Sequence, residues 1–410
     1  MQPKYQEAMD KKVNEMMALL NSKEDRLLYQ KTTYTQSHLN KIDTINYGSY
    51  YTPINCVDIV YTLLSQYTNI NEYKVLDTSC GCGNFLRYNN CIGADIDKIA
   101  IKKAKNNANC KIIERNGLLN VCREKYEINR NEKLIIVGNP PYNDTTSIIN
   151  NKIKQEVCKI DNDFKHRDIG CSFLLSYVQL YPDYICILHP LSYLIKQTNF
   201  NSLKVFCENY RLIDGIIVSS GIFYNTSKTT HFPIIIALYK KDKQGMNFDY
   251  IKQYTFRTID NKQFSLNNFD VIDNYITKYP NHKVINKENT ITYFYTMRDI
   301  NALKRSQTFM KNETANSIRV NRDNFAYYCY VDCFKDEIEH LPYYFGNCNI
   351  QINNDAFLKI KDCFIEKSCT KYSFLNTLKK EKQQNNLFVN NYNMAIDEYF
   401  KNLLGVHYVY

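Results

Sequence analysis

The sequence Gly138-Asn-Pro-Pro-Tyr142 places an amide, a carbonyl and an aromatic ring on one short loop. The Asn139 side chain and the carbonyl of Pro140 provide two acceptors, which can take both hydrogens of one exocyclic amino group. Tyr142 offers a flat face on which the ring that carries this amine can stack. Pro140 and Pro141 each fix their own φ and restrict the preceding residue, so the acceptors stand on a stiff, extended loop.

An apolar run, Leu134–Val137, comes directly before this loop and predicts the element that positions it. Such a run is typical of a strand that is buried on both faces of a parallel sheet. Ligands of open α/β sheets bind at the carboxyl ends of the strands, where this loop would lie. For an isolated Asn-Pro-Pro a simple proline-bracketed turn is the alternative, because a motif match alone is only a hypothesis.

A glycine-containing turn lies upstream, in Lys74–Leu86. A strand ending at Leu76 would be followed by the turn Asp77–Gly83, which we expect to lead into a helix. Gly81 and Gly83 allow the backbone to approach a ligand where a Cβ would obstruct it. The spacing is not GxGxxG and no lysine follows the glycines, so a phosphate-binding loop is disfavoured.

The segment Cys91–Asp97 predicts a second strand that closes with Asp95. An acidic residue at the end of the second strand can accept hydrogen bonds from both hydroxyls of a ribose. The glycine turn and this acid together indicate a nucleoside without phosphates as the ligand.

Four motifs follow one another along the chain: Gly48–Pro53 (GSYYTP), Val75–Leu86 (VLDTSCGCGNFL), Gly93–Asp97 (GADID) and Gly138–Tyr142 (GNPPY). With these motifs in this order, the chain resembles the gamma-class, amino-methylating DNA methyltransferases of restriction–modification systems, over roughly residues 45–240. The resemblance implies an α/β fold, a Rossmann-like class I methyltransferase domain with a mixed seven-stranded sheet, and a C-terminal target-recognition domain. It also implies S-adenosyl-L-methionine as cofactor and methyl transfer to the N6 amine of an adenine flipped out of double-stranded DNA.

The resemblance further implies roles for individual residues. In the target-base pocket, Asn139 and Pro140 would accept from the adenine amine, Pro141 would stiffen the loop, and Tyr142 would stack on the base. Phe223 would provide a second aromatic contact, with Tyr224 and Phe232 as competitors for that role. The residues implied in cofactor binding are Tyr51, Thr52, Pro53, Asp77, Ser79, Cys80, Gly81, Asp95, Ile96 and Asn116.

Asp77 would approach the cofactor ammonium group, Asp95 would hold the ribose hydroxyls, and Ile96 would pack on the cofactor adenine. The family usually has an aspartate that binds the amine of this adenine, and Asn116 is its best match here, with Glu114 as a nearby alternative. Thr78, where the family often has proline, is a second departure from the pattern.

The chain length of 410 residues fits two domains. We expect an N-terminal helical extension at 1–45, a catalytic domain at 46–242 and a DNA target-recognition domain at 243–410, with the boundary near the polar run 240–245. The apolar spacing within residues 1–30 predicts an amphipathic helix, and residues 388–410 predict a helix at the end of the chain.

The 15 cysteines show no CxxC pair and no Cys/His quartet, so no metal site is predicted. Without a signal peptide or a long apolar segment, the simplest interpretation is a soluble protein with reduced thiols, in the cytoplasm of a bacterium or a virus-infected host cell. Methylation at carbon-5 of cytosine needs a cysteine nucleophile, carried in that family by a Pro-Cys dipeptide. The chain has no Pro-Cys, which excludes this reaction.

The formal net charge of +10 fits a polyanionic partner, since neutralising phosphates releases counterions. Double-stranded DNA is therefore the expected partner, bound by a monomer and without membrane attachment. A cognate restriction endonuclease would act separately. The densest basic stretch of the C-terminal region provides the candidate phosphate or base contacts Arg298, Lys304, Arg305, Lys311, Arg319 and Arg322, for which a merely solvated surface is the alternative.

Other functions are compatible with parts of this pattern. An NPPY methyltransferase acting on RNA or on a glutamine amide of a protein is the closest alternative, because a side-chain amide presents the same NH2 group. The long region 243–410 and the YYTP segment favour DNA. Cytosine-N4 enzymes usually have serine where Asn139 stands, and a catalytically inactive DNA-binding module would not need the intact motifs. His189 is interpreted as structural, because the methylated amine can lose its proton to water.

Overall fold

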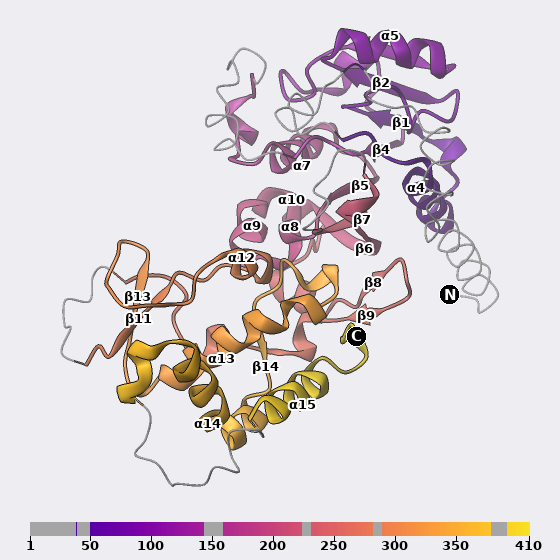
Figure 1. Ribbon diagram of the computed structural model, residues 1–410. Helices are drawn as coiled ribbons and strands as arrows, with labels where there is room; N and C mark the ends of the chain where they lie inside the picture. The colour runs from indigo at the N-terminus through magenta and orange to yellow at the C-terminus, as the bar shows by residue number, and fades with distance from the viewer. Residues whose placement is uncertain (1–37, 39–49, 143–158, 224–230, 282–288, 379–391) are drawn as a thin grey trace. The chain divides into compact units, whose positions relative to one another are not determined.

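The computed structural model describes residue 38 and the ranges 50–142, 159–223, 231–281, 289–378 and 392–410 (Figure 1). The chain divides into two compact units, Met1–Phe264 and Ser265–Tyr410. Apart from His38, the extension predicted for residues 1–45 lies outside the described residues.

The first unit is built on a mainly parallel sheet with the strand order β3-β2-β1-β4-β5-β7-β6-β8-β9. β7 runs antiparallel to both of its neighbours, β5 and β6. This order confirms the predicted α/β class and the Rossmann-like class I methyltransferase fold. The strands are β1 (Lys74–Asp77), β2 (Cys91–Asp95), β3 (Lys111–Glu114), β4 (Leu134–Gly138), β5 (Tyr184–Pro190), β6 (Tyr210–Ser219), β7 (Pro233–Lys241), β8 (Phe256–Thr258) and β9 (Gln263–Phe264).

The sheet has nine strands, whereas seven were predicted. β8 pairs in parallel with β6, and β9 pairs antiparallel with β8. These two short strands follow the polar run 240–245, at which we expected the first unit to end. The unit therefore extends to Phe264 instead of ending near residue 242.

Helices cover both faces of this sheet, and Figure 1 shows α4 on one side and α7 to α10 on the other. Because both faces are covered, Leu134, Ile135, Ile136 and Val137 in β4 are all 0% exposed, as expected for a buried parallel strand. The helices are α4 (Ile54–Tyr67), α5 (Lys98–Asn107), α7 (Ile169–Leu180), α8 (Ser192–Ile195), α9 (Gln197–Ser202), α10 (Lys204–Asn209) and α11 (Phe248–Gln253).

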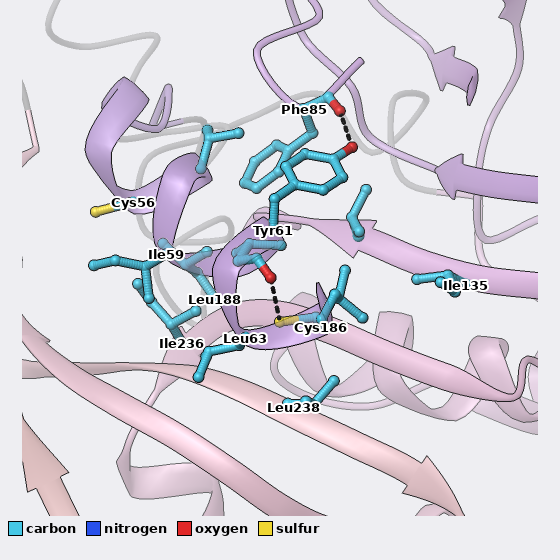
Figure 2. Close-up of a cluster of buried hydrophobic side chains, with 14 of the residues drawn as sticks. Cys56, Ile59, Tyr61, Leu63, Phe85, Ile135, Cys186, Leu188, Ile236 and Leu238 are labelled. Carbon is cyan, nitrogen blue, oxygen red and sulfur yellow. Dashed lines mark hydrogen bonds between the residues drawn. The ribbon is translucent and has the colours of Figure 1, made fainter. Parts of the chain in front are cut away.

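The core between α4 and the sheet also fixes the glycine turn (Figure 2). The Tyr61 hydroxyl of α4 donates a hydrogen bond to the carbonyl of Phe85, which follows the turn. The Cys186 thiol of β5 lies 3.7 Å from the Val60 carbonyl of α4. One helix thus holds both the turn after β1 and the centre of the sheet.

The helix predicted after the glycine turn is wrong. Residues 78–90 form a series of turns instead, and β2 begins at Cys91. Only a few residues separate Gly83 from this strand, and the Asn90 amide donates to the carbonyls of Ile70 at 3.2 Å and Tyr73 at 2.6 Å. These bonds hold the segment against the residues that connect α4 to β1.

The second unit combines small sheets with three longer helices. A three-stranded sheet has the order β12-β11-β13, and a two-stranded sheet pairs β10 with β14. The predicted terminal helix is present as α15. The elements are β10 (Asp270–Val271), β11 (Thr292–Tyr295), α12 (Ile300–Arg305), β12 (Phe309–Met310), β13 (Ser317–Val320), α13 (Phe325–Asp336), β14 (Gln351–Ile352), α14 (Asn354–Lys371) and α15 (Tyr392–Leu404).

The second unit has its own core. The buried Tyr330 of α13 contacts Phe364 of α14 and Phe400 of α15, with ring centroids 5.3 Å and 5.7 Å away. Nearby, the Asp332 carboxylate accepts hydrogen bonds from Thr308 at 2.5 Å and Ser368 at 3.0 Å. Aromatic packing and a satisfied polar network thus join its helices to one another.

Candidate active site

Three strand ends carry the predicted site residues to one edge of the sheet. β1 ends with Asp77, β2 ends with Asp95, and β4 ends with Gly138, directly before Asn139. β1 lies between the other two strands and runs parallel to both. Their carboxyl ends therefore meet at the same edge, as the sequence predicts.

Gly138 brings the Asn139 loop against the Asp77 carboxylate. Its φ is +147°, and a Cβ at this position would lie 2.8 Å from Asp77 Oδ1. Any other residue would have to displace that carboxylate or the loop itself. The glycine therefore allows the acidic end of β1 and the amide end of β4 to share one site.

The turn after β1 directs backbone N–H groups at both acids. The Ser79 N–H donates to Asp77 Oδ1 at 3.0 Å, and the Gly81 N–H donates to Asp95 Oδ2 at 2.7 Å. Gly81 has φ +51°, which an L side chain rarely adopts. The turn thus holds the carboxyl groups of two neighbouring strands in fixed orientations.

The segment before α4 bridges the two loops of the site. The Asn139 amide donates from Nδ2 to the Tyr50 carbonyl at 2.9 Å, and the Asn84 amide donates to the Thr52 carbonyl at 2.8 Å. The Tyr51 ring covers Gly81, since a Cβ on that glycine would lie 3.1 Å from Tyr51 Cζ. Pro53 follows as a buried residue at the start of α4.

The bond to Tyr50 determines which way the Asn139 amide faces. Only its NH2 end can donate to a carbonyl, so Nδ2 is turned to Tyr50 and Oδ1 is turned away from it. Among the described residues Oδ1 is buried and has no hydrogen-bond partner. A buried acceptor left in this way costs free energy that a donor on a ligand would recover. The amide is held ready to accept a hydrogen bond.

Burial also disfavours the charged forms of the two carboxyl groups at this edge of the sheet. The pKa of Asp77 is raised to about 8, first by burial and further by the negative charge of Asp95. Its Oδ2, like the Ser79 hydroxyl, is buried without a partner in the described part of the chain. Burial raises the pKa of Asp95 as well, although the N–H groups of Asp97 and Gly81 favour its charged form. Two such carboxyl groups side by side suit a ligand that carries positive charge.

The Asp95 turn continues into α5. Asp97 caps this helix by accepting from Ile99 N at 2.8 Å, and its other oxygen lies 2.7 Å from His38 Nε2. Burial works against ionisation of Asp97, but these hydrogen bonds lower its pKa. Ile96 between the two acids is 50% exposed, so an apolar face stands open beside Asp95.

Asn116 follows β3 and is engaged within its own loop. Its Nδ2 donates to the Lys159 carbonyl at 2.7 Å, and its Oδ1 accepts from Leu118 N at 2.9 Å. The amide oxygen still has a second lone pair for a ligand. Glu114, the alternative, is exposed and lies 3.4 Å from Lys98 Nζ.

The described aromatic residues of the predicted base pocket pack in or against one core cluster and leave little surface for a ligand. Tyr142 is half-buried, and burial raises the pKa of its hydroxyl. Phe223 is 4% exposed within the core cluster, against which Tyr142 and Phe232 also pack. Pro140 is buried, Pro141 is half-buried, and Tyr224 lies outside the described residues. Phe223 therefore presents little surface to a ligand in this arrangement.

Sequence reasoning missed three contributors to the site. Tyr50 acts through its carbonyl, which no residue type reveals. Asn84 ties the glycine turn to Thr52, and its position within the motif was the only available signal. His38 reaches Asp97 from a distant segment, and nothing in the local sequence indicates that contact.

The predicted basic residues gather around the three-stranded sheet of the second unit. Arg298 follows β11, Lys304 and Arg305 end α12, and Arg322 follows β13. These four side chains and Lys311 are exposed. Arg319 on β13 differs, because its guanidinium lies 2.8 Å from Glu313. We call the exposed residues Arg298, Lys304, Arg305 and Arg322 the basic lobe.

The described residues contain no cluster of three or more histidine, cysteine, aspartate or glutamate side chains arranged to hold a metal ion. None of the helices in the described ranges combines the length and apolar composition needed to cross a membrane.

No family model and no curated protein matches the chain. Solved structures are similar to it at low scores. One is a candidate class I S-adenosylmethionine-dependent methyltransferase from Listeria monocytogenes, 15% identical, covering 61% of this chain and 73% of that one, with TM-score 0.35. A candidate RNA methyltransferase from Pyrococcus horikoshii is 15% identical, covers 54% and 99%, and has TM-score 0.36.

A predicted N6-adenine-specific DNA methylase from Listeria monocytogenes is 12% identical to this chain, covering 48% of this chain and 54% of that one, with TM-score 0.26. Because all three scores are low, the fold assignment rests on the strand order of the sheet.

Proposed function

We propose that this protein is a DNA methyltransferase that transfers a methyl group from S-adenosyl-L-methionine to the N6 amine of adenine. The observation that carries the proposal is the oriented Asn139 amide. Its Oδ1, which has no hydrogen-bond partner within the described part of the chain, stands on the loop that Gly138 holds against Asp77. An acceptor for an amine, the buried carboxyl group of Asp77 and the half-buried one of Asp95 thus occur at one sheet edge, where the two acids suit a cationic cofactor.

The residues at the strand ends fit this cofactor. Asp77 would bind its ammonium group, Asp95 its ribose hydroxyls, and Ile96 would pack on its adenine. Ser79, Cys80 and Gly81 would line the site, Tyr51 to Pro53 would cover it, and Asn116 would accept from the adenine amine. When bound, the cofactor supplies an electrophilic methyl group on a positively charged sulfur. Asp77 and Asp95 would offset part of that positive charge.

The target amine would be bound by the Asn139 loop. The lone pair of this amine is delocalised into the ring, so the free base is a poor nucleophile. Asn139 Oδ1 and the Pro140 carbonyl would accept its two hydrogens and favour a tetrahedral nitrogen with a directed lone pair. Holding reactants in this way can contribute roughly 7–11 kcal/mol. The product is a cationic amine, which can release its extra proton to water.

Adenine in a duplex is inaccessible to this loop, so the base must be flipped out. Tyr142 would stack on the flipped base and offset part of the unstacking cost. Phe223 would contact the base only after moving from its buried position in the core cluster. The second unit would provide target recognition, with the basic lobe contacting phosphates or base edges.

The experiment that tests this function is transfer of a tritiated methyl group from S-adenosyl-L-methionine to three separate polymers. Unmethylated genomic DNA, total RNA and a protein extract are each incubated with the enzyme and counted. We expect label in DNA. Label confined to RNA or to protein would instead support an NPPY methyltransferase acting on RNA or on a glutamine amide.

Cofactor binding should release a proton from Asp77. With a pKa of about 8 in the free protein, this carboxyl group is mostly protonated at pH 7, and the cofactor ammonium favours its ionised form. We expect release of nearly one proton at pH 7, and an affinity that falls about tenfold per pH unit below pH 8. Calorimetric titrations in two buffers of different ionisation enthalpy measure both quantities. Tight binding without proton release would exclude this role.

The Asp77→Asn variant is the matched control. It should bind the cofactor weakly and release no proton. Because the folded state holds the Asp77 proton more tightly than the unfolded state, the wild-type stability falls as pH rises from about 4 to about 8. The variant lacks this loss, so relative to the wild type its free energy of unfolding without cofactor should rise between pH 4 and pH 8 and be the higher of the two at pH 8. Equal stabilities at that pH would contradict the assignment.

A further inference from the structure

The first turn of α7 places Gly170 next to Tyr142. A Cβ on Gly170 would lie 3.1 Å from Tyr142 Cβ and 2.4 Å from the Tyr193 hydroxyl. Gly170 is in the first turn of α7 and does not have a positive φ. Alanine would therefore suit the backbone at this position, and the neighbouring side chains are what exclude it.

Tyr193 of α8, the other residue beside this glycine, is held in place by two contacts. Its hydroxyl donates to Asp168, the residue that caps α7 by accepting from Gly170 N at 2.9 Å. Its ring stacks on His189, with centroids 5.3 Å apart and planes 8° from parallel. Tyr193 is 2% exposed, so water does not compete with either of these contacts.

His189 is itself fixed on both sides of its ring. Burial lowers its pKa to about 4, so it is neutral at physiological pH. Nδ1 lies 2.9 Å from the Pro190 carbonyl, which can only accept, so Nδ1 carries the proton. Nε2 then accepts from the Tyr239 hydroxyl at 2.7 Å. Both nitrogens are used, which supports the structural role predicted for this residue.

We infer that Gly170 and Tyr193 are positioning residues that set where Tyr142, and with it the Asn139 loop, stands at the end of β4. The inference rests on the proposed function. Tyr193 is held in place by its contacts with Asp168 and His189. The space that a Cβ on Gly170 would fill is bordered by both Tyr193 and Tyr142. Extra volume at Gly170 has to move Tyr142, because Tyr193 is held in place by its own contacts.

The side chains are packed closely enough for a small change to matter. A displacement of about 1 Å in a reacting group can cost on the order of 10²-fold in rate. The Tyr193 hydroxyl is the atom that a Cβ on Gly170 would meet first. Removing this hydroxyl should therefore make room for the additional methyl group. The effects of substitutions at the two positions on the rate of methyl transfer are therefore predicted to be non-additive.

The test is a double-mutant cycle with Gly170→Ala, Tyr193→Phe and the double variant. Single-turnover methyl transfer is measured at saturating S-adenosyl-L-methionine, on the polymer that the unsubstituted enzyme labels. We expect Gly170→Ala to lower the rate about 10²-fold and Tyr193→Phe about tenfold. In the Tyr193→Phe background, Gly170→Ala should cost less than about threefold. Cofactor affinity should change little.

Tyr210→Phe is the matched control, since its buried hydroxyl donates to the Pro182 carbonyl at 3.1 Å, at the opposite end of β5. Equal rate losses from Gly170→Ala in both backgrounds would overturn the inference, as would a Gly170→Ala enzyme with normal rate. If Gly170→Ala fails to fold, the comparison of Tyr193→Phe with Tyr210→Phe takes its place. Equal rates of methyl transfer in these two variants would also overturn the inference. Failure of the proposed function is recognised separately, because the unsubstituted enzyme then labels no DNA.

Discussion

Asn139→Ala should lower the rate of methyl transfer by roughly 10³-fold while leaving the affinity for the cofactor almost unchanged. The amide oxygen is oriented by its NH2 group, which donates to the Tyr50 carbonyl at 2.9 Å. Removing the amide removes an acceptor for the substrate amine and no group assigned to the cofactor. The decrease should therefore appear in the rate of a single turnover at saturating DNA, measured with labelled cofactor.

Two further variants make this result specific. Asn139→Ser keeps a hydroxyl acceptor, so it should retain more activity than Asn139→Ala. Asn209→Ala removes an amide that donates to the Val205 carbonyl at 2.8 Å near the end of α10, and it should not affect transfer. An Asn139→Ala enzyme within tenfold of the unsubstituted rate would exclude the amide from the chemistry.

Neutralising the basic lobe should weaken DNA binding by roughly 10²–10³-fold near 0.1 M salt, with little effect on cofactor binding. Arg298, Lys304, Arg305 and Arg322 are exposed around one small sheet, so replacing all four with serine leaves the core of the second unit intact. Each side chain that no longer neutralises a phosphate should reduce the slope of log affinity against log salt by about 0.9. Fluorescence anisotropy with labelled duplex DNA over a salt series measures both effects.

A charge-matched comparison separates the effect of this surface from that of net charge. Lys304→Ser/Arg305→Ser and Lys359→Ser/Lys361→Ser each remove two exposed positive charges from the second unit. Only the first pair belongs to the basic lobe, so only the first should change the salt dependence markedly. Equal effects of the two pairs would assign DNA binding to the overall charge of the unit and not to this surface.

The parts of the site that were predictable from sequence are those fixed by strand ends. A fully apolar run such as Leu134–Val137 is typical of a buried strand, and the position of the following loop follows from that assignment. Asp77 and Asp95 end parallel strands, and their convergence follows from the sheet topology. Both predictions concern local sequence and a single rule of sheet architecture.

The failed predictions concern competition between local preference and tertiary contacts. The turn after Gly83 was expected to enter a helix, but the bonds from Asn90 to Ile70 and Tyr73 hold it as turns. The polar run 240–245 resembles a domain boundary, yet β8 pairs with β6 beyond it. In both cases distant parts of the chain decide the outcome, and a window of sequence does not contain them.

The orientation of the Asn139 amide also depends on a distant part of the chain. Its partner is a backbone carbonyl 89 positions away in the sequence, and any residue type could have supplied it. The close packing of Tyr142 and Tyr193 around Gly170 is likewise visible only once α7, α8 and the Asn139 loop are placed together. The sequence therefore predicts the candidate groups of the site, whereas the structure shows what holds them in position.

The most direct test of the central claim is nucleoside mass spectrometry of DNA after incubation with the enzyme and methyl-labelled S-adenosyl-L-methionine. Unmethylated genomic DNA is used, with Asn139→Ala as the parallel control. The proposed adenine methylation predicts labelled N6-methyladenine with the unsubstituted enzyme and almost none with the control. Label on cytosine, or label in DNA that is equal for both proteins, would contradict it.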